Sequence, residues 1–259
     1  MTGVALVTGG GKRLGRAMAL YLAGRGLDVA VHYNGSAQAA DEVAAQIEGM
    51  GRRAVALQAD LLSEDDMQAL LPRAARALGP VTCLVNNASV FEYDQIDTIT
   101  RESWDRHLES NLRAPVVLTQ ALADQAPAAA TDDAGEPLAQ ALVVNMIDQR
   151  VRKLTPAFMS YTIAKMGLWA FTQTAAQALA PRVRVNAIGP GPTLQGARQS
   201  AGHFARQRAA TVLGRGADPA DITAALGYFL DAPAVTGQLL CIDGGQHLAW
   251  QTPDVLGTE

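Results

Sequence analysis

The stretch VALVTGGGKRLG, residues 4–15, carries more information about the fold than any other part of this sequence. Residues 4–8 form a short apolar run typical of a buried strand, and glycines follow it at once. Beyond the glycines, Leu14, Met18 and Leu22 recur at the spacing of one helix face. The stretch therefore predicts a strand, a tight turn and the first turns of a helix.

Such a turn suits an anion, because free backbone N–H groups and the positive end of the helix dipole point into it. Gly9 and Gly11 match two glycines of the dinucleotide-binding fingerprint, but Leu14 occupies the third position and Gly15 comes one residue later. We predict that Gly9, Gly11 and Leu14 contact a dinucleotide cofactor. An ordinary strand-to-helix turn is the alternative interpretation.

The rest of the chain repeats the alternation of strand and helix. Further strands are expected at residues 28–33, 53–60, 81–85, 141–148, 182–188 and 239–243. The alternation predicts a single-domain α/β Rossmann fold over residues 1–259, with a doubly wound, seven-stranded parallel sheet flanked by helices. Residues 126–140 are expected to form a flexible surface insertion, and residues 193–217 a mobile lid over the substrate.

Composition argues against several classes of function. The 259 residues have a formal net charge of -4, and the 21 basic residues form no long cluster, so nucleic acid and membranes are not expected partners. We expect no signal peptide, and no apolar run reaches the roughly 18 residues of a membrane span. The spacing of Cys83, Cys241 and the histidines matches neither a disulfide framework nor a metal site, which indicates a cytoplasmic protein without a metal ion.

The end of the second strand indicates which dinucleotide is bound. An acidic residue about twenty positions past the glycines would hold the ribose hydroxyls of NAD, but the strand ends His32-Tyr33-Asn34-Gly35-Ser36. Donors without a carboxylate suit a ribose 2'-phosphate, so we predict NADP(H) as the cofactor. The expected contacts are His32, Tyr33, Asn34, Ser36 and, from the glycine turn, Arg13. An Arg13 that simply faces solvent is the alternative.

Polar side chains also follow the fourth strand, in the run Asn86-Asn87-Ala88-Ser89. Ligands of parallel sheets bind at the carboxyl ends of the strands, which is where this run lies. We therefore predict that Asn87, Ala88 and Ser89 contact the cofactor. The same residue types also form simple turns, which is the alternative.

Tyr161 and Lys165 open an apolar helix, residues 160–180, and share one of its faces. A free phenol titrates near about 10, and an adjacent ammonium lowers that pKa, so we predict that Lys165 makes Tyr161 a general acid or base. A surface pair is the alternative. Asn111 lies within another predicted helix, where asparagine is mildly unfavourable, which suggests a functional task.

Together these residues resemble the short-chain dehydrogenases/reductases. The motifs of that family occur in order over residues 4–245, as Thr8-Gly9 with Gly15, Asp60, Asn86-Asn87-Ala88, Asn111, Tyr161 with Lys165, and Pro190-Gly191. The resemblance implies an NADP-dependent oxidoreductase and a homotetramer built on the helices that contain Asn111 and Tyr161. It also implies cofactor contacts for Asp60, Leu61, Tyr161, Lys165, Pro190 and Gly191.

Three departures from the family pattern resemble its pteridine reductase branch, which includes dihydromonapterin-type reductases. Arg13 replaces a glycine of the first turn, Ser89 replaces the last glycine of Asn-Asn-Ala-Gly, and Asp148 replaces the usual serine before the tyrosine. Phe91 follows just beyond Ser89. This branch implies that Arg13 touches cofactor phosphate and pterin, and that Phe91 stacks on the pterin ring opposite the nicotinamide.

The aspartate suggests the reaction. A dihydropterin presents a C=N bond, so a hydride on carbon must be matched by a proton on the ring nitrogen. Our hypothesis is that Asp148 and Tyr161 supply this proton, Lys165 holds the cofactor ribose, and Asn111 orders a water relay. Asp148 as a capping residue at the strand end and Phe91 as a packed aromatic are the alternatives.

Two other functions are compatible with the sequence. One is an NADPH-dependent carbonyl reductase acting on a ketoacyl, sugar or similar substrate, which Asp148 disfavours. The other is a non-catalytic NADP(H)-sensing module, which the presence of both Tyr161 and Lys165 disfavours.

Overall fold

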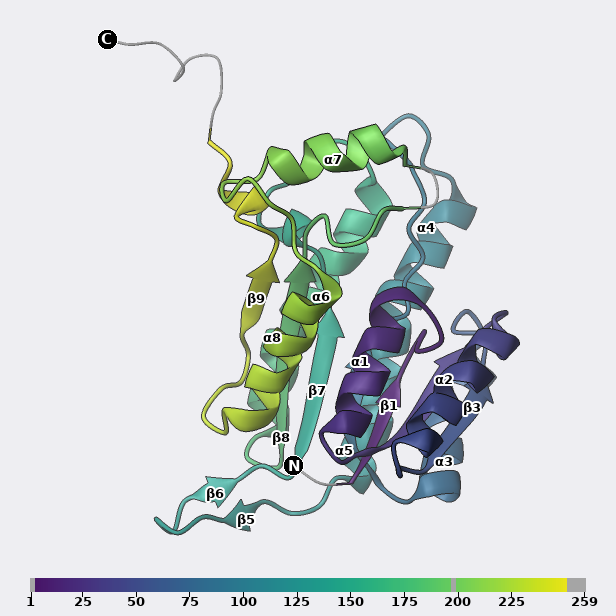
Figure 1. Cartoon of the computed structure of the whole chain (residues 1–259), viewed down its shortest axis with the longest axis vertical. Helices are drawn as coiled ribbons and strands as arrows, with labels where there is room; N and C mark the ends of the chain where they lie inside the picture. The colour runs from purple at the N-terminus through teal and green to yellow at the C-terminus, as the bar shows by residue number, and fades with distance from the viewer. Residues whose placement is uncertain (1–2, 197–198, 251–259) are drawn as a thin grey trace.

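The computed structural model describes residues 3–196 and 199–250, and its centre is a parallel sheet of seven strands (Figure 1). The strand order is β3-β2-β1-β4-β7-β8-β9. These strands are β1 (Val4–Val7), β2 (Asp28–Tyr33), β3 (Ala54–Gln58), β4 (Val81–Asn86), β7 (Ala141–Met146), β8 (Val183–Pro190) and β9 (Leu239–Ile242). The predicted doubly wound α/β fold is therefore confirmed.

Helices cover both faces of this sheet and give the molecule three layers. Leu70, Leu118 and Ala175 bring α3, α5 and α6 onto one face, whereas Met18 and Phe229 bring α1 and α8 onto the other. The α-helices are α1 (Arg13–Gly24), α2 (Ala37–Gly49), α3 (Glu64–Leu78), α4 (Arg101–Leu108), α5 (Ala114–Gln125), α6 (Met159–Leu179), α7 (Ala201–Ala209) and α8 (Pro219–Asp231). Both faces of the sheet are thus buried, which explains the nearly continuous apolar strands.

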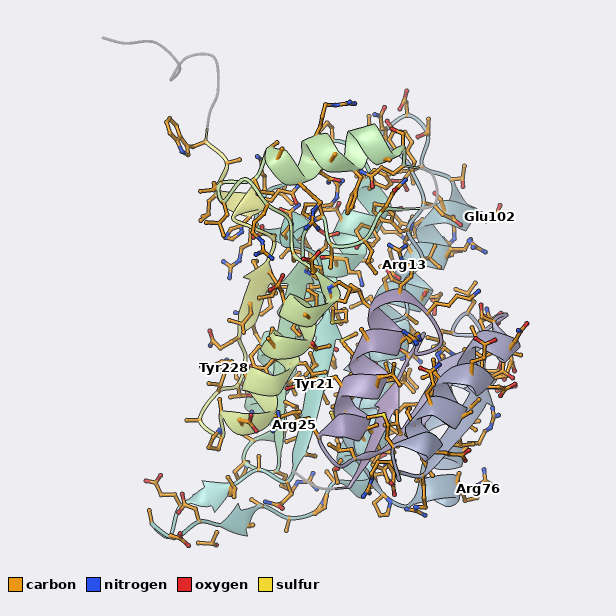
Figure 2. The ribbon with its side chains drawn as sticks, viewed as in Figure 1. Arg13, Tyr21, Arg25, Arg76, Glu102 and Tyr228 are labelled. Carbon is orange, nitrogen blue, oxygen red and sulfur yellow. The ribbon has the colours of Figure 1, made fainter. Side chains whose placement is uncertain are left out.

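Close packing of α1 on α8 steadies the helix that follows the glycine turn. Tyr21 of α1 and Arg25, which follows the end of that helix, point toward α8 (Figure 2). Arg25 Nη2 lies 2.5 Å from Asp231 Oδ1 at the end of α8. A Cβ at Gly227 would overlap the Tyr21 hydroxyl, so glycine at this position permits the contact.

The order of the strands reverses between β1 and β4, and a crevice opens beyond the carboxyl ends of these two strands. The glycine turn follows β1 here. Gly9 has a φ of 62°, which favours glycine, and a Cβ at Gly15 would overlap the Gly9 carbonyl oxygen. The glycine at position 15 is therefore required for the close approach of α1 to the turn.

Two predicted loops contain regular structure. Residues 126–140 include a hairpin of β5 (Ala130–Thr131) and β6 (Pro137–Leu138), which lies at the opposite end of the sheet from α7 (Figure 1). The predicted lid contains α7, whose residues include none that is buried, so its sequence has no apolar period to reveal a helix. Residues 197–198 of that lid, and residues 1–2 and 251–259, lie outside the described residues.

Candidate functional site

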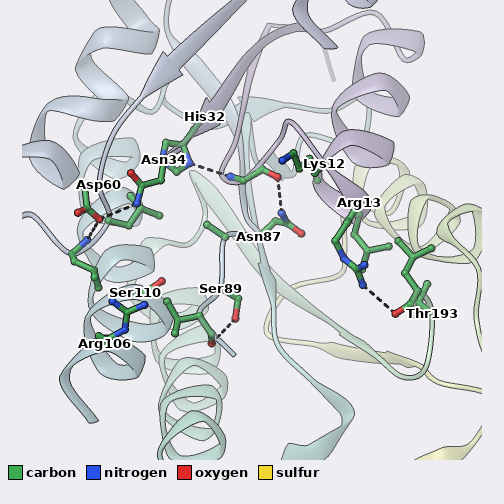
Figure 3. A pocket seen from close by; sticks show the side chains of 18 of the residues that line it. Lys12, Arg13, His32, Asn34, Asp60, Asn87, Ser89, Arg106, Ser110 and Thr193 are labelled. Carbon is green, nitrogen blue, oxygen red and sulfur yellow. Dashed lines mark hydrogen bonds between the residues drawn. The ribbon is translucent and has the colours of Figure 1, made fainter. Parts of the chain in front are cut away.

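A cavity of about 630 Å³ lies beyond β1 and β4, at the predicted position (Figure 3). Many of the predicted cofactor contacts line it, namely Gly9, Arg13, Leu14, His32, Asn34, Asp60, Leu61, Asn87, Ala88, Ser89 and Gly191. Gly191 is also required sterically, because a Cβ there would lie 2.5 Å from Asp243 Cβ. Its lining comes from segments far apart in the chain, between the glycine turn and the start of the predicted lid.

Hydrogen bonds join the two segments that follow β1 and β4, both of which line this cavity. Asn87 Nδ2 donates to Thr8 O at 2.8 Å and to Gly9 O at 3.3 Å. Thr8 Oγ1 accepts from the backbone N–H groups of Asn87 and Ala88, both at 2.9 Å. The glycine turn after β1 and the polar run after β4 therefore form one unit.

His32 lines the cavity but has no free ring nitrogen. Its Nδ1 accepts from the Gly9 N–H at 3.0 Å, and its Nε2 donates to Ala59 O at 3.0 Å. Burial lowers its pKa, so the ring is neutral. Both ring nitrogens therefore have protein partners, and the ring shapes the glycine turn. A contact between His32 and the cofactor stays a prediction.

Three other predicted contacts line neither this cavity nor the neighbouring one in the described part of the chain. Tyr33 packs against a hydrophobic cluster, and Ser36 lies at the N-cap position of α2. A Cβ at Gly11 would lie 3.0 Å from Ala40 N, so Gly11 permits contact with α2. Only Asn34 of the strand-end residues after His32 reaches the cavity, where its Nδ2 donates to Asp60 Oδ1 at 3.3 Å.

Arg13 joins the glycine turn to the segment after β8. Its φ of 52° is unusual for a residue with a side chain. Its guanidinium donates to Gln195 O at 2.8 Å and to Leu194 O at 3.0 Å. Figure 3 shows the Arg13 side chain reaching toward the segment that contains Thr193. The alternative of a purely solvent-facing Arg13 is therefore wrong, since the side chain bridges two segments and lines this cavity and its neighbour.

The neighbouring cavity, of about 360 Å³, brings together Asp148, Tyr161, Lys165, Phe91 and Pro190. Tyr161 Oη donates to Asp148 Oδ2 at 3.0 Å. Asp148 Oδ1 accepts from the Arg150 N–H at 2.8 Å, so Asp148 also caps the short helix η2 (Gln149–Val151). The capping interpretation of Asp148 is therefore confirmed, while its other oxygen lies beside Tyr161 and its catalytic role stays a prediction.

Burial governs the protonation of this group. It raises the pKa of Asp148, and burial together with the Asp148 carboxyl raises the pKa of Tyr161 well above its ordinary value. Burial lowers the pKa of Lys165 to about 8, and its Nζ donates to Met146 O at 2.8 Å. The prediction that Lys165 lowers the pKa of Tyr161 is therefore wrong in this structure, because burial and Asp148 act the other way.

Asn111 lies in a π-helical turn, η1 (Glu109–Arg113), and its side chain is fully engaged. Asn111 Oδ1 accepts from the Val90 N–H at 2.9 Å, and Asn111 Nδ2 donates to Val90 O at 2.8 Å. π-helical turns often occur at functional sites. The amide holds the segment that carries Phe91, and a water relay at Asn111 stays a prediction.

Phe91 presents an aromatic surface beside Tyr161. Its ring stacks on Phe158 with centroids 4.2 Å apart and planes within 6°, and it meets the Tyr161 ring edge-on at 4.7 Å. Phe91 is still 48% exposed, so part of the ring is open to a ligand. Phe158 itself was missed by sequence reasoning, because its φ of 57° and its stacking depend on tertiary contacts.

No group of His, Cys, Asp and Glu side chains within residues 3–196 and 199–250 could hold a metal ion. In the same residues, no helix is long and apolar enough to cross a membrane. The site consists instead of a cavity suited to a dinucleotide and an adjoining cavity with an acid, a phenol and an ammonium. This combination of fold and site defines a Rossmann-fold oxidoreductase.

Comparison with known proteins specifies the family. A model described as short chain dehydrogenase matches residues 3–205, and the chain belongs to this family. An uncharacterised oxidoreductase of Methylorubrum extorquens is 32% identical over 93% of the chain and 96% of that protein. A 3-oxoacyl-[acyl-carrier-protein] reductase of Staphylococcus aureus is 27% identical over 96% of the chain and 99% of that protein.

Among solved structures, the chain resembles FolM alternative dihydrofolate reductase 1 from Brucella canis, complexed with NADP. The two are 43% identical with a TM-score of 0.90, over 97% of the chain and 96% of that protein. The chain is thus similar both to a reductase named for dihydrofolate and to one named for a 3-oxoacyl group.

Proposed function

We propose that this protein is an NADPH-dependent reductase that transfers hydride to the C=N bond of a dihydropterin. The observation that carries the proposal is the hydrogen bond between Tyr161 Oη and Asp148 Oδ2, in a cavity that Phe91 also lines. A carbonyl reductase needs no carboxyl at this position. Similarity to the Brucella canis alternative dihydrofolate reductase supports the same assignment.

The larger cavity fits NADP(H). The backbone around the cavity is packed so closely at Gly9, Gly15 and Gly191 that a Cβ at any of these positions would crowd a neighbouring residue. Lys12 and Arg13 add positive charge to the lining, and the end of β2 carries no acidic residue that would repel a 2'-phosphate. The similar Brucella canis protein was solved with NADP. When bound, NADPH supplies the hydride.

The residues of the chain supply the proton. Burial raises the pKa of Asp148 and so favours its protonated form, and this carboxyl is hydrogen-bonded to the Tyr161 hydroxyl. The pair holds the proton at the wall of the cavity and delivers it to the ring nitrogen of the substrate. Lys165 contacts the ribose of the cofactor, and the open part of the Phe91 ring stacks on the pterin.

Parallel assays of NADPH oxidation with dihydrobiopterin, dihydrofolate and an acetoacetyl thioester test this function. We expect turnover with at least one of the two dihydropterins. Consumption only with the thioester would instead support a carbonyl reductase, the second candidate, which the similarity to a 3-oxoacyl reductase favours. Tight NADPH binding without any turnover would indicate a sensing module.

We also propose a cytoplasmic homotetramer whose interfaces include α6. Ile163 and Met166 of this helix are 42% and 39% exposed, which is unusual for large apolar side chains. Light scattering of the purified protein tests this assembly, and a monomeric mass would contradict it.

A further inference from the structure

The segment that carries Phe91 is anchored on both sides of that residue. The preceding residue, Val90, forms two hydrogen bonds with the side-chain amide of Asn111, one through its N–H and one through its carbonyl oxygen. After Phe91, the Glu92 N–H donates to His107 Nε2 at 3.1 Å. The Phe91 ring is therefore half-exposed, whereas the backbone on both sides of it is hydrogen-bonded to His107 of α4 and Asn111 of η1.

His107 continues into a buried chain of hydrogen bonds. Since its Nε2 accepts from Glu92, its Nδ1 carries the hydrogen and donates to Ser160 Oγ at 2.7 Å. Ser160 Oγ donates in turn to Asp94 Oδ2, and the Ser160 N–H donates to Asp94 Oδ1 at 3.2 Å. His107 and Ser160 are 0% exposed and Asp94 is 1% exposed.

These three residue types also form nucleophilic triads, but the geometry here excludes that chemistry. A catalytic serine is bonded to the imidazole that takes its proton, and the carboxylate lies behind the imidazole. Here Ser160 lies between His107 and Asp94, and its hydroxyl donates a hydrogen bond to the Asp94 carboxylate and not to the imidazole. No part of the serine is exposed to a substrate.

The same network also holds the start of the helix that carries the phenol. Ser160 precedes Tyr161 in the chain, and the His107 ring lies edge-on to the Tyr161 ring with centroids 6.0 Å apart. Asp94 O accepts from the N–H of Phe158, on which Phe91 stacks, at 2.8 Å. One buried cluster therefore holds the Phe91 segment and the first turn of α6 together.

We propose that His107, Ser160 and Asp94 are positioning residues that fix the Phe91 ring relative to the Tyr161 hydroxyl, and thereby set the affinity for a flat, ring-shaped substrate. The proposal rests on the proposed function, in which Phe91 stacks on that ring. A ring that is fixed before binding loses little freedom when the substrate arrives. His107 is the central member, because its Nε2 accepts from the residue directly after Phe91 while its Nδ1 donates to Ser160.

Three substitutions of His107 separate its two hydrogen bonds. His107→Gln can place an oxygen near the position of Nε2 and accept from Glu92, whereas His107→Asn can place an N–H near Nδ1 and donate to Ser160. His107→Phe loses both bonds. We expect His107→Asn and His107→Phe to raise the KM for dihydrobiopterin about tenfold, and His107→Gln to stay within about threefold of wild type.

The dissociation constant for NADPH and the thermal midpoint serve as controls. A merely structural role would lower the midpoint and all activities together, without a difference between the Gln and Asn variants. Equal KM values in both, or an unchanged KM in both, would overturn the proposal. The Gln and Asn pair decides the question even if the Phe variant does not fold.

Hydrogen exchange at the Glu92 amide separates this proposal from the proposed function. We expect faster exchange in His107→Asn than in His107→Gln, whatever the substrate is. A wild-type enzyme that reduces no dihydropterin would reject the function, whereas the exchange would still report whether His107 anchors the segment. Equal exchange in wild type and His107→Asn would reject the anchor itself.

Discussion

At the scale of single residues, the ability of Asp148 to act as the proposed proton donor depends on its surroundings. An exposed aspartate is ionised at neutral pH and cannot donate a proton. Asp148 lies beside Tyr161, and burial raises its pKa, which favours the protonated form that can donate. The bond from the Arg150 N–H fixes its other oxygen. The two oxygens thus have separate tasks, one in the backbone turn and one in the cavity.

Replacing this acid tests the proton route directly. We expect Asp148→Ser and Asp148→Asn to reduce the kcat for dihydrobiopterin by about 100-fold or more, the usual contribution of a positioned general acid. The dissociation constant for NADPH, measured by fluorescence, should stay near that of wild type. Unchanged turnover in either variant would reject the relay.

The raised pKa of Asp148 also predicts a pH dependence. In the proposed mechanism the protonated carboxyl is the active form, so kcat should be constant at low pH and fall as pH rises through the raised pKa. The same shift makes the protein lose stability over that range, because the unfolded chain releases this proton at a lower pH. A kcat profile of wild type that lacks the falling limb would contradict the assignment.

At the scale of elements, the glycine turn and the start of α1 form a unit that tolerates no side chain at its closest contact. A Cβ at Gly15 would overlap the Gly9 carbonyl oxygen and lie 2.7 Å from Asn87 Nδ2. The contact therefore involves both the turn and the polar run after β4. Disturbing it should disturb the part of the cavity that the glycine turn and Asn87 line.

Gly15→Ala should destabilise the protein by about 1–3 kcal/mol, the usual effect of overpacking, and weaken NADPH binding. Gly49→Ala, near the end of α2, is the matched control because nothing lies within 4 Å of its Cβ position. We expect that control to leave NADPH affinity unchanged. Denaturant unfolding and NADPH titration measure both effects, and identical behaviour of the two variants would contradict the steric argument.

At the scale of the whole molecule, the site and the insertion lie at opposite ends of the sheet (Figure 1). The hairpin of β5 and β6 consists mostly of exposed residues and belongs to neither hydrophobic cluster of the sheet faces. Its connection to the body includes the bond from Arg182 Nη1 to Ala126 O at 3.4 Å. The catalytic end should therefore be insensitive to the hairpin.

Replacing residues 129–138 with a short glycine-serine link tests this separation. We expect the NADPH dissociation constant and dihydrobiopterin kinetics to stay within about twofold of wild type, as usual for changes in exposed loops. Turnover and the oligomeric mass are the measurements. A large loss of activity without a change of mass would show that the insertion couples to the site.

Much of the fold follows from local sequence. Apolar runs such as residues 4–8 and glycines such as Gly9 specify strands and turns through short-range sterics, and the alternation of elements leaves few topologies. Strand ends differ from prediction by one or two residues, so Asp60 and Asp148 follow their strands rather than end them. The helix α7 was missed because an exposed helix needs no apolar face.

The properties of the candidate site could be predicted only in part from the sequence. The sequence by itself determined the chemical groups: Tyr161, Lys165 and Asp148 were identified from residue types and order. Tertiary structure decided their protonation and neighbours, because burial in three dimensions reverses the expected shift of the Tyr161 pKa and turns His32 into a support for the glycine turn. Hydrogen-bond partners and desolvation depend on residues far apart in the chain, and no local pattern encodes them.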